Sequence, residues 1–248
     1  MSLATNTARS FLPGGNMKRF LLALLAVALA IGNVEAGYEA LFQEVQAAAW
    51  AVYVRSTGGM NAVCSASAYY SDTLETRLLS AGHCFTGMDL DRTDFLVTQD
   101  HRAFYKATLR KTGLKIRAGK TPTSTQLDDY AGHDWATITV SVGGQRILPV
   151  GDSTKLQIGE DLVIVGVPFG LDFLAVQGIV GSKDISLSQL VWNHYFGANI
   201  FLAGGNSGSG IISANQKAIV GIVTAGPGSQ SSMAIFMPVQ LLPADALR

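Results

Sequence analysis

Charged residues and cysteines are both scarce in this 248-residue chain. The 18 lysines and arginines balance the 18 aspartates and glutamates, and no basic run is present. This balance argues against electrostatic capture of nucleic acid or of an anionic lipid surface. The only cysteines are Cys64 and Cys84, and the two further well-spaced ligands that a structural zinc site needs are absent. We therefore expect no nucleic-acid partner, no metal and no cofactor.

The N-terminal apolar run, residues 20–31, is too short to span a bilayer comfortably. Lys18 and Arg19 precede it, and the segment Val34–Ala36 ends it in a small-x-small-like pattern. This order of basic, apolar and small residues is that of a secretory signal peptide, here residues 1–36, with Met17 as a second candidate start. A buried helix and a retained membrane anchor are the competing interpretations. We expect a secreted or periplasmic protein with no stable membrane insertion after cleavage.

Most of the remaining chain has the pattern of β structure. With 48% hydrophobic residues it can bury a substantial core in one or two domains. Short apolar, β-branched runs bounded by turn-forming residues predict strands, most clearly at Ala51–Val54, Ala136–Val140, Leu162–Val167 and Ala218–Val223. The exception is Glu39–Ala49, where Leu41, Phe42 and Val45 are spaced along one face of a short helix.

The segment Gly204–Gly210 (GGNSGSG) holds a serine in a glycine-rich turn between apolar runs. A nucleophilic serine needs an exposed hydroxyl on a tight turn, with backbone N–H groups free to face a developing oxyanion. Glycine permits such a turn because it reaches positive φ without steric cost. Taken alone the segment is ambiguous, because glycine and serine also alternate in ordinary turns and linkers.

A base and an orienting acid are found in two further segments. Leu78–Cys84 (LLSAGHC) places His83 at the end of an apolar run, and Gly132–Ile138 (GHDWATI) places Asp134 at the start of another. Each residue has an ordinary alternative, a strand-end histidine and a turn aspartate. The pair Asp128-Asp129 is a rival acid, but Tyr130-Ala131-Gly132 follows it in place of a strand, so we interpret it as a solvated loop.

Together the three segments resemble the trypsin-like (chymotrypsin-fold) serine proteases. Leu79–Cys84 resembles the family's Thr-Ala-Ala-His-Cys box, and Asp134–Ile138 its Asp-hydrophobic-Ala-x-hydrophobic box. Gly205–Gly210 resembles its Gly-Asp/Asn-Ser-Gly-Gly/Ser box. The chain order His, Asp, Ser is also that of this family, whereas subtilisins run Asp, His, Ser and α/β-hydrolases run Ser, acid, His.

The resemblance implies an all-β fold of two packed antiparallel six-stranded barrels, with the active site in the cleft between them. Residues 37–144 would form the N-terminal barrel with His83 and Asp134, and residues 145–248 the C-terminal barrel with Ser207.

The implied function is that of a secreted serine endopeptidase. Ser207 is the nucleophile, His83 the base and Asp134 its orienting acid, while the N–H groups of Gly205 and Ser207 form the oxyanion hole. The alternative is a catalytically silent pseudoprotease that uses its cleft as a binding module, although every triad position holds a competent residue.

In an oxidising compartment outside the cytoplasm, two cysteines are most simply interpreted as one disulfide. The resemblance supports this, because in the family the cysteine after the catalytic histidine bonds one on the preceding strand. Such a bond would hold the loop that carries His83. A cysteine nucleophile is disfavoured, because the box that would carry it holds Ser207.

Substrate contacts are also implied by the resemblance. Thr224-Ala225-Gly226 would pair with the substrate backbone as an added strand. Phe201, six residues before Ser207, would lie at the base of the first specificity pocket, where cleavage after lysine or arginine requires aspartate. We therefore expect a protein or peptide substrate with an apolar residue before the cleaved bond. We also expect a monomer with no appended peptide-binding module.

Two departures separate the chain from the digestive and clotting members of the family. Those enzymes activate when a new Ile-Val-Gly-Gly-like N-terminus pairs with an aspartate before the serine. Here Asn206 holds the aspartate's place, and residues 37–40 read GYEA. The chain resembles the bacterial HtrA-like and viral branches more closely, as does Ala234–Val239 (AIFMPV), and activation of the vertebrate type is not expected.

Overall fold

The computed structural model describes residues 38–56, 59–86, 94–114, 133–187, 192–226 and 230–248. Leu41–Arg248 form one compact unit. The predicted signal peptide, residues 1–36, lies outside the described ranges. Among the residues that are described, no helix has the length and apolar character needed to cross a membrane.

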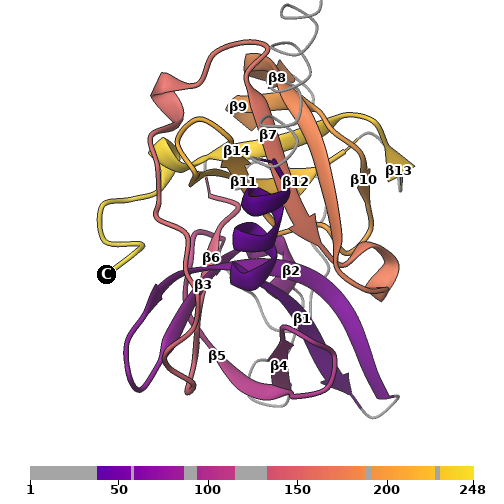
Figure 1. The fold of residues 1–248 in the computed structure, drawn as a ribbon, viewed down its shortest axis with the longest axis vertical. Helices are drawn as coiled ribbons and strands as arrows, with labels where there is room; N and C mark the ends of the chain where they lie inside the picture. The colour runs from indigo at the N-terminus through magenta and orange to yellow at the C-terminus, as the bar shows by residue number, and fades with distance from the viewer. Residues whose placement is uncertain (1–37, 57–58, 87–93, 115–132, 188–191, 227–229) are drawn as a thin grey trace, which may run out of the picture. The chain divides into compact units, whose positions relative to one another are not determined.

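The first half of this unit is a closed antiparallel barrel in the order β1-β2-β3-β6-β5-β4 (Figure 1). Closure pairs both edges of every described strand, so none of these strands is left as an open sheet edge. The strands are β1 (Ala49–Ser56), β2 (Gly59–Ser71), β3 (Thr76–Ser80), β4 (Asp94–Thr98), β5 (Tyr105–Thr112) and β6 (Ala136–Val140).

The second half forms another closed antiparallel barrel, in the order β11-β12-β14-β9-β8-β7. A separate two-stranded sheet pairs β10 (Leu202–Ala203) with β13 (Gln230–Ser231). The barrel strands are β7 (Asp161–Gly166), β8 (Leu174–Leu187), β9 (Trp192–Asn199), β11 (Gly210–Ser213), β12 (Ala218–Ala225) and β14 (Ala234–Pro238). The predicted fold class, two six-stranded antiparallel barrels, is confirmed.

The predicted helix is also present and spans residues 38–48, while Ala49 begins β1. Its buried residues Leu41, Val45 and Ala48 follow the spacing of one helical face. Phe42 is partly buried against the same apolar cluster.

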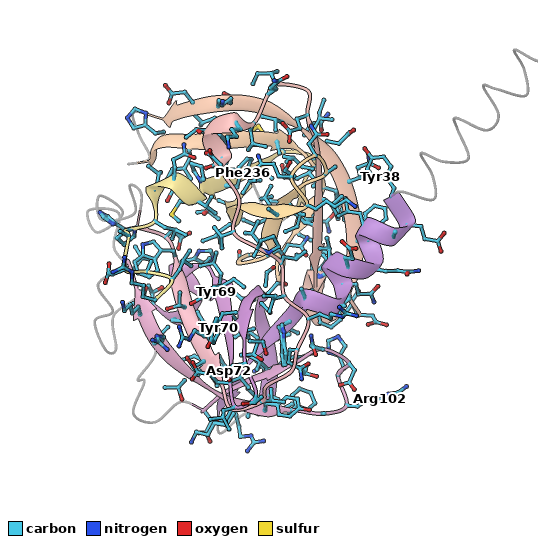
Figure 2. The ribbon with its side chains drawn as sticks, turned by 60° about the vertical axis from the view of Figure 1, so that its left-hand side comes forward. Tyr38, Tyr69, Tyr70, Asp72, Arg102 and Phe236 are labelled. Atoms are coloured by element: carbon cyan, nitrogen blue, oxygen red, sulfur yellow. A yellow bond between two sulfur atoms is a disulfide. The ribbon has the colours of Figure 1, made fainter. Side chains whose placement is uncertain are left out.

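Two clusters of buried apolar residues explain why the barrels pack together. The larger contains Trp50, Leu78 and Ile138 of the first barrel and continues into Ile212 and Ile222 of the second. The smaller fills the second barrel and includes Phe236, which is labelled in Figure 2. The rings of Phe196 and Phe236 meet edge to face, with their centroids 5.6 Å apart. Because one cluster spans both barrels, separating them would expose apolar surface to water.

The connecting segment, residues 141–160, strengthens this packing. It contains a short 3-10 helix, η3 (Ser153–Lys155), and its Leu148 N–H donates to the Ala68 carbonyl at 2.9 Å. Its Gly151 N–H donates to the Ile219 carbonyl of the second barrel at 2.8 Å.

The C-terminal residues after η5 (Val239–Leu241) return to the first barrel, where Lys111 Nζ donates to the Asp245 carbonyl at 2.6 Å.

The predicted disulfide between Cys64 and Cys84 is present. It joins β2 to η1 (Gly82–Phe85), a 3-10 turn just after β3, with a Cα–Cα distance of 6.2 Å. Both cysteines are buried, and no free cysteine is found in the part of the chain that the structure describes. The bond therefore ties the turn that carries His83 to the middle of the first barrel.

Removing this disulfide should destabilise the fold. The two cysteines are 20 residues apart. On the chain-entropy account, a cross-link over a loop of this length contributes about 3 kcal/mol. We expect the double variant Cys64→Ala/Cys84→Ala to lose about that much free energy of unfolding, measured by urea denaturation. Reductant should lower the midpoint of the wild type and leave the variant unchanged; equal midpoints for wild type and variant would contradict the prediction.

Candidate active site

His83 follows β3 and Asp134 precedes β6, two neighbouring strands of the first barrel, and their side chains form a direct pair. The His83 ring Nδ1 lies 2.9 Å from Asp134 Oδ2 and 3.2 Å from Oδ1. The backbone N–H of His83 also donates to Asp134 Oδ1 at 2.8 Å. One carboxylate therefore holds both the ring and the main chain of His83.

Asp134 is fully buried, whereas the His83 side chain is 28% exposed. Asp134 lies in a tight three-residue turn, closed by the Trp135 N–H donating to the His133 carbonyl at 2.8 Å. The turn precedes β6, as the sequence predicted. The rival acids Asp128 and Asp129 lie outside the described residues.

The surroundings of His83 act on its pKa in opposite directions. Burial lowers the pKa, because it disfavours the charged imidazolium. The negative charge of Asp134 and the hydrogen bond to it raise the pKa, and together they prevail. The net effect is a pKa above the ordinary value of about 6.5.

Ser207 lies in a glycine-dependent turn between β10 and β11. The Asn206 N–H donates to the Ala203 carbonyl at 3.1 Å, and Gly205 has a φ of +100° at the third position of this turn. Gly208, just after the serine, has a φ of +85°. A Cβ at Gly205 would collide with the Val167 carbonyl oxygen, so both conformation and space require glycine there.

The backbone N–H groups around Ser207 divide into two sets. Those of Asn206, Gly208 and Ser209 donate to main-chain carbonyls at 2.8–3.1 Å. Those of Gly205 and Ser207 donate to none of the groups that the structure describes. Two amides on alternate residues thus remain available for an acceptor, which is the arrangement that an oxyanion hole requires.

A hydrogen bond to the Gly204 carbonyl sets the direction of the Gly205 N–H. It accepts a 2.5 Å hydrogen bond from the N–H of Phe169, which belongs to the short 3-10 turn η4 (Pro168–Gly170). Phe169 has a φ of +56°, a conformation uncommon for a residue other than glycine. Since the C=O and N–H of one peptide point in opposite directions, this bond turns the Gly205 N–H the other way.

The serine turn meets the first barrel at the His83 turn. The Ser65 N–H of β2 donates to the Ser207 carbonyl at 2.8 Å, and Cys84 Sγ lies 4.0 Å from the same oxygen. The structure contains no hydrogen bond between the His83 ring and the Ser207 hydroxyl, both of which it describes. Such a bond is often long before substrate binds and shortens in the complex.

Cys64, His83 and Cys84 place potential ligand atoms within 4.8 Å of one another. A metal ion is bound by the free thiolate form of cysteine. Here both sulfur atoms belong to one disulfide, so the trio does not have the chemistry of a metal site.

A pocket of about 210 Å³ opens beside Ser207. It is lined by Leu202, Ala203, Gly204, Ser207, Val223, Ala225 and Gly226. No charged side chain occurs among these described lining residues, so the pocket suits an apolar group.

The structure separates the predicted substrate-binding residues. Ala225 and Gly226 line the pocket, while Thr224 is buried at a bulge of β12 and donates to the Ile222 carbonyl at 3.3 Å. Phe201 is not a lining residue, and its side chain is 41% exposed. The neighbouring Leu202, with Val223, supplies the apolar wall that we had expected from Phe201.

Ser65 and Phe169 contact the serine turn but were not identified from the sequence. Ser65 lies 140 residues from Gly205, and no motif connects the two. The backbone N–H of Phe169 can bind the Gly204 carbonyl whatever its side chain, so the residue type at position 169 does not indicate this contact. Only the position of Ser65 directly after Cys64 pointed to its region of the fold.

Two six-stranded barrels, a histidine paired with a buried aspartate in the first, and a serine turn flanked by glycines in the second are together typical of the chymotrypsin-fold serine hydrolases. The chain matches the trypsin-like peptidase domain family over residues 64–222, more than half of its length. It therefore belongs to the trypsin-like peptidase family.

Relatives of the chain include bacterial proteins described as probable periplasmic serine endoproteases, DegP-like. The one from Pseudomonas putida (strain W619) is 32% identical over 89 residues, which is 36% of this chain and 18% of that protein. The one from Halomonas elongata is 28% identical over 120 residues, 46% of this chain and 25% of that protein. The matched part thus spans a quarter or less of these relatives' length.

Solved structures with the same fold include the HtrA-type protease AlgW, determined with a tripeptide and with a decapeptide. The first has a TM-score of 0.64 at 19% identity and covers 85% of this chain and 61% of that one. The second has a TM-score of 0.64 at 16% identity, with 82% and 64% covered. The predicted resemblance to the HtrA-like branch is confirmed.

The His83 pair predicts a specific titration behaviour. We expect the imidazole pKa of the wild type to lie above about 6.5, measured by NMR of the ring protons. In Asp134→Asn the pKa should fall below that value, because burial remains while the attracting charge is lost.

In the wild type, the pair's contribution to stability is present below pH ~6.5 and is lost as the pH rises through the folded-state pKa.

The control is the free energy of unfolding of Asp134→Asn at pH 8, which shows that the variant is folded when its histidine is titrated. A wild-type pKa below that of the variant would mean that burial, and not Asp134, dominates the site.

Proposed function

We propose that this protein is a serine endopeptidase that uses Ser207, His83 and Asp134 as a catalytic triad. The main support is the meeting of three distant segments at one barrel interface. A buried carboxylate holds the imidazole at 2.9 Å, and the serine turn opposite leaves two amides available. Membership of the trypsin-like peptidase family supports the same reaction class.

The proposed reaction has two halves. Ser207 Oγ attacks the carbonyl carbon of the scissile peptide while His83 Nε2 accepts the hydroxyl proton, and the carbonyl oxygen becomes an oxyanion. The tetrahedral intermediate then breaks its C–N bond, and His83 gives the proton to the leaving amine. Water, deprotonated by His83, hydrolyses the resulting acyl-enzyme, which releases the new carboxyl group and restores Ser207.

Asp134 and the serine turn stabilise the charges of this reaction. Asp134 holds the imidazole through Nδ1 and favours the imidazolium that forms, in keeping with the raised pKa of His83. The N–H groups of Gly205 and Ser207 would bind the oxyanion, and one such donor typically contributes about 3 kcal/mol to transition-state binding.

The pocket beside Ser207 would receive the side chain that precedes the cleaved bond. Its walls, Leu202 and Val223, favour an apolar side chain, because an unpaired charge would lose its hydration there. Ala225 and Gly226 lie at the end of β12, where the substrate backbone would add as a strand. The structures of AlgW with peptides make a peptide substrate reasonable for this fold.

We further propose that the protein works outside the cytoplasm. The signal-peptide pattern of residues 1–36 supports export, and the related DegP-like proteins are described as periplasmic. The Cys64–Cys84 disulfide fits an oxidising compartment.

Covalent labelling tests the nucleophile. A fluorophosphonate probe should label the wild type on Ser207, and Ser207→Ala should remove the label completely. Because the triad works as a unit, Ser207→Ala and His83→Ala should each lower peptide hydrolysis by at least about 10⁴-fold. Labelling is followed by in-gel fluorescence and mass spectrometry of the modified peptide.

A matched control is Ser232→Ala, which removes a serine between β13 and β14 that does not line the Ser207 pocket. It should label like the wild type. A folded wild type that never labels would exclude the peptidase and leave the binding-module alternative.

Cleavage-site profiling tests the pocket. With a peptide library, we expect apolar residues before the cleaved bond to be favoured over lysine and arginine by roughly tenfold or more, measured as kcat/KM. Phe201→Ala should leave this preference unchanged, because Phe201 lies outside the pocket wall, whereas Val223→Ala should broaden it. Selection for arginine or lysine would refute the assignment of the pocket.

A further inference from the structure

Ser65 is a fully buried serine on β2 of the first barrel, directly after the disulfide residue Cys64. Its backbone and its hydroxyl both bind groups of the second barrel. Neither the family boxes nor the proposed triad assigns it a role.

The Ser65 hydroxyl makes two hydrogen bonds of opposite direction. It accepts the Val167 N–H at 3.1 Å and donates to the Gly205 carbonyl at 2.8 Å. A hydroxyl can do both at once because it carries one donor proton and two acceptor lone pairs. Both partners adjoin the serine turn, since Val167 immediately precedes η4 and Gly205 is an expected oxyanion residue.

The backbone of Ser65 adds two further bonds. Its N–H donates to the Ser207 carbonyl at 2.8 Å, and its carbonyl accepts the Ser80 hydroxyl at 2.7 Å. Ser80 ends β3, two residues before the His83 turn begins. Ser65 therefore lies between the two halves of the proposed catalytic site.

These bonds fix the peptide planes that flank the two available amides. The Gly205–Asn206 peptide is held at its carbonyl by Ser65 and at its N–H by Ala203. The Ser207–Gly208 peptide is held at its carbonyl by Ser65 and at its N–H by Val223. The N–H groups of Gly205 and Ser207 belong to the peptides just before these two, so their directions depend on the planes that Ser65 holds.

Such a restraint is needed because the turn is intrinsically free to change. Gly204 and Gly205 adjoin one another, and glycine reaches both signs of φ at similar cost. Nothing in the local sequence therefore selects the orientation in which the Gly205 N–H is available. The selection must come from tertiary hydrogen bonds. The Phe169 N–H binds the Gly204 carbonyl, and the Ser65 hydroxyl binds the Gly205 carbonyl.

We propose that Ser65 is a positioning residue for the oxyanion hole. Its hydroxyl holds the Gly205–Asn206 peptide, which lies between the Gly205 and Ser207 amides, and so keeps both in the orientation that binds the transition state. The proposal rests on the proposed peptidase function and names a determinant of it outside the triad. Ser65 makes no hydrogen bond to the Ser207 hydroxyl, and in this proposal it acts only through the backbone of the serine turn.

The test compares Ser65→Ala with Ser67→Ala in the full chain. Ser67 is the next serine of β2 and is also buried, and its hydroxyl likewise accepts a backbone N–H of the second barrel, that of Gly210 at 3.0 Å. It makes no bond to the Gly205–Ser207 peptides. Ser67→Ala thus reproduces the loss of a buried hydroxyl between the barrels without releasing the proposed oxyanion hole.

Kinetic measurements provide the first readout. Loss of one oxyanion donor commonly costs about 10²–10³ in kcat. Ser65→Ala keeps both donors and the backbone bond to the Ser207 carbonyl, but it frees the Gly205–Asn206 peptide between the donors. We therefore expect kcat and the rate of fluorophosphonate labelling to fall by about 10- to 100-fold. KM should change little, because the pocket walls remain. Ser67→Ala should keep wild-type kcat and KM.

NMR of the backbone amides provides a readout that does not depend on activity. In Ser65→Ala the signals of Gly205 and Ser207 should shift or broaden, while the His83 ring protons keep their wild-type titration. In Ser67→Ala the Gly205 and Ser207 signals should stay in place.

The two hypotheses fail in different ways. If Ser65→Ala leaves the Gly205 and Ser207 amides unchanged, or Ser67→Ala perturbs them equally, the positioning role is overturned whether or not the wild type is active. If those amides respond as expected but the wild type is never labelled, the positioning role stands and the peptidase function fails.

Discussion

The proposed chemistry depends on the packing of one barrel against the other. His83 and Asp134 belong to the first barrel and Ser207 to the second, so no single segment holds a nucleophile and a base together. A catalytic base must approach its proton donor to about 3 Å. The apolar cluster that continues from Trp50 and Leu78 into Ile212 and Ile222 holds the barrels in contact, and the hydrogen bonds of Ser65 join β2 to the serine turn.

Within that frame, local interactions hold the buried carboxylate and the serine turn in two different ways. Asp134 is fully buried, yet it accepts the backbone N–H of His83 and contacts the ring, and the attraction outweighs the effect of burial on the His83 pKa. In the serine turn, by contrast, two hydrogen-bond donors are left without a partner among the described residues. Its carbonyls are held by Phe169 and Ser65, so that the N–H groups of Gly205 and Ser207 remain available.

The sequence allowed a large part of the fold to be predicted. Runs such as Ala136–Val140 and Ala218–Val223 became β6 and β12, because short β-branched segments between turn residues leave few other ways to bury their side chains. The spacing of Leu41 and Val45 identified the helix for the same reason. The lining of the pocket beside Ser207 was harder to predict, since Phe201 is 41% exposed and Leu202, one residue later, lines the pocket. In an extended chain, successive side chains point to opposite sides, so a shift of one residue changes which side chain faces the pocket. The number of residues between Phe201 and Ser207 does not determine that direction.

The sequence by itself determined the residue types that the proposed acyl transfer needs, their order along the chain, and the glycines that permit the turn at Ser207. Tertiary structure alone decided which of the turn's amides are available and what holds them. Those orientations depend on partners as distant as Ser65, 140 residues before Gly205, and on the backbone N–H of Phe169. A backbone hydrogen bond leaves no mark on residue identity, and adjoining glycines allow more than one conformation, so only the packed barrels select one.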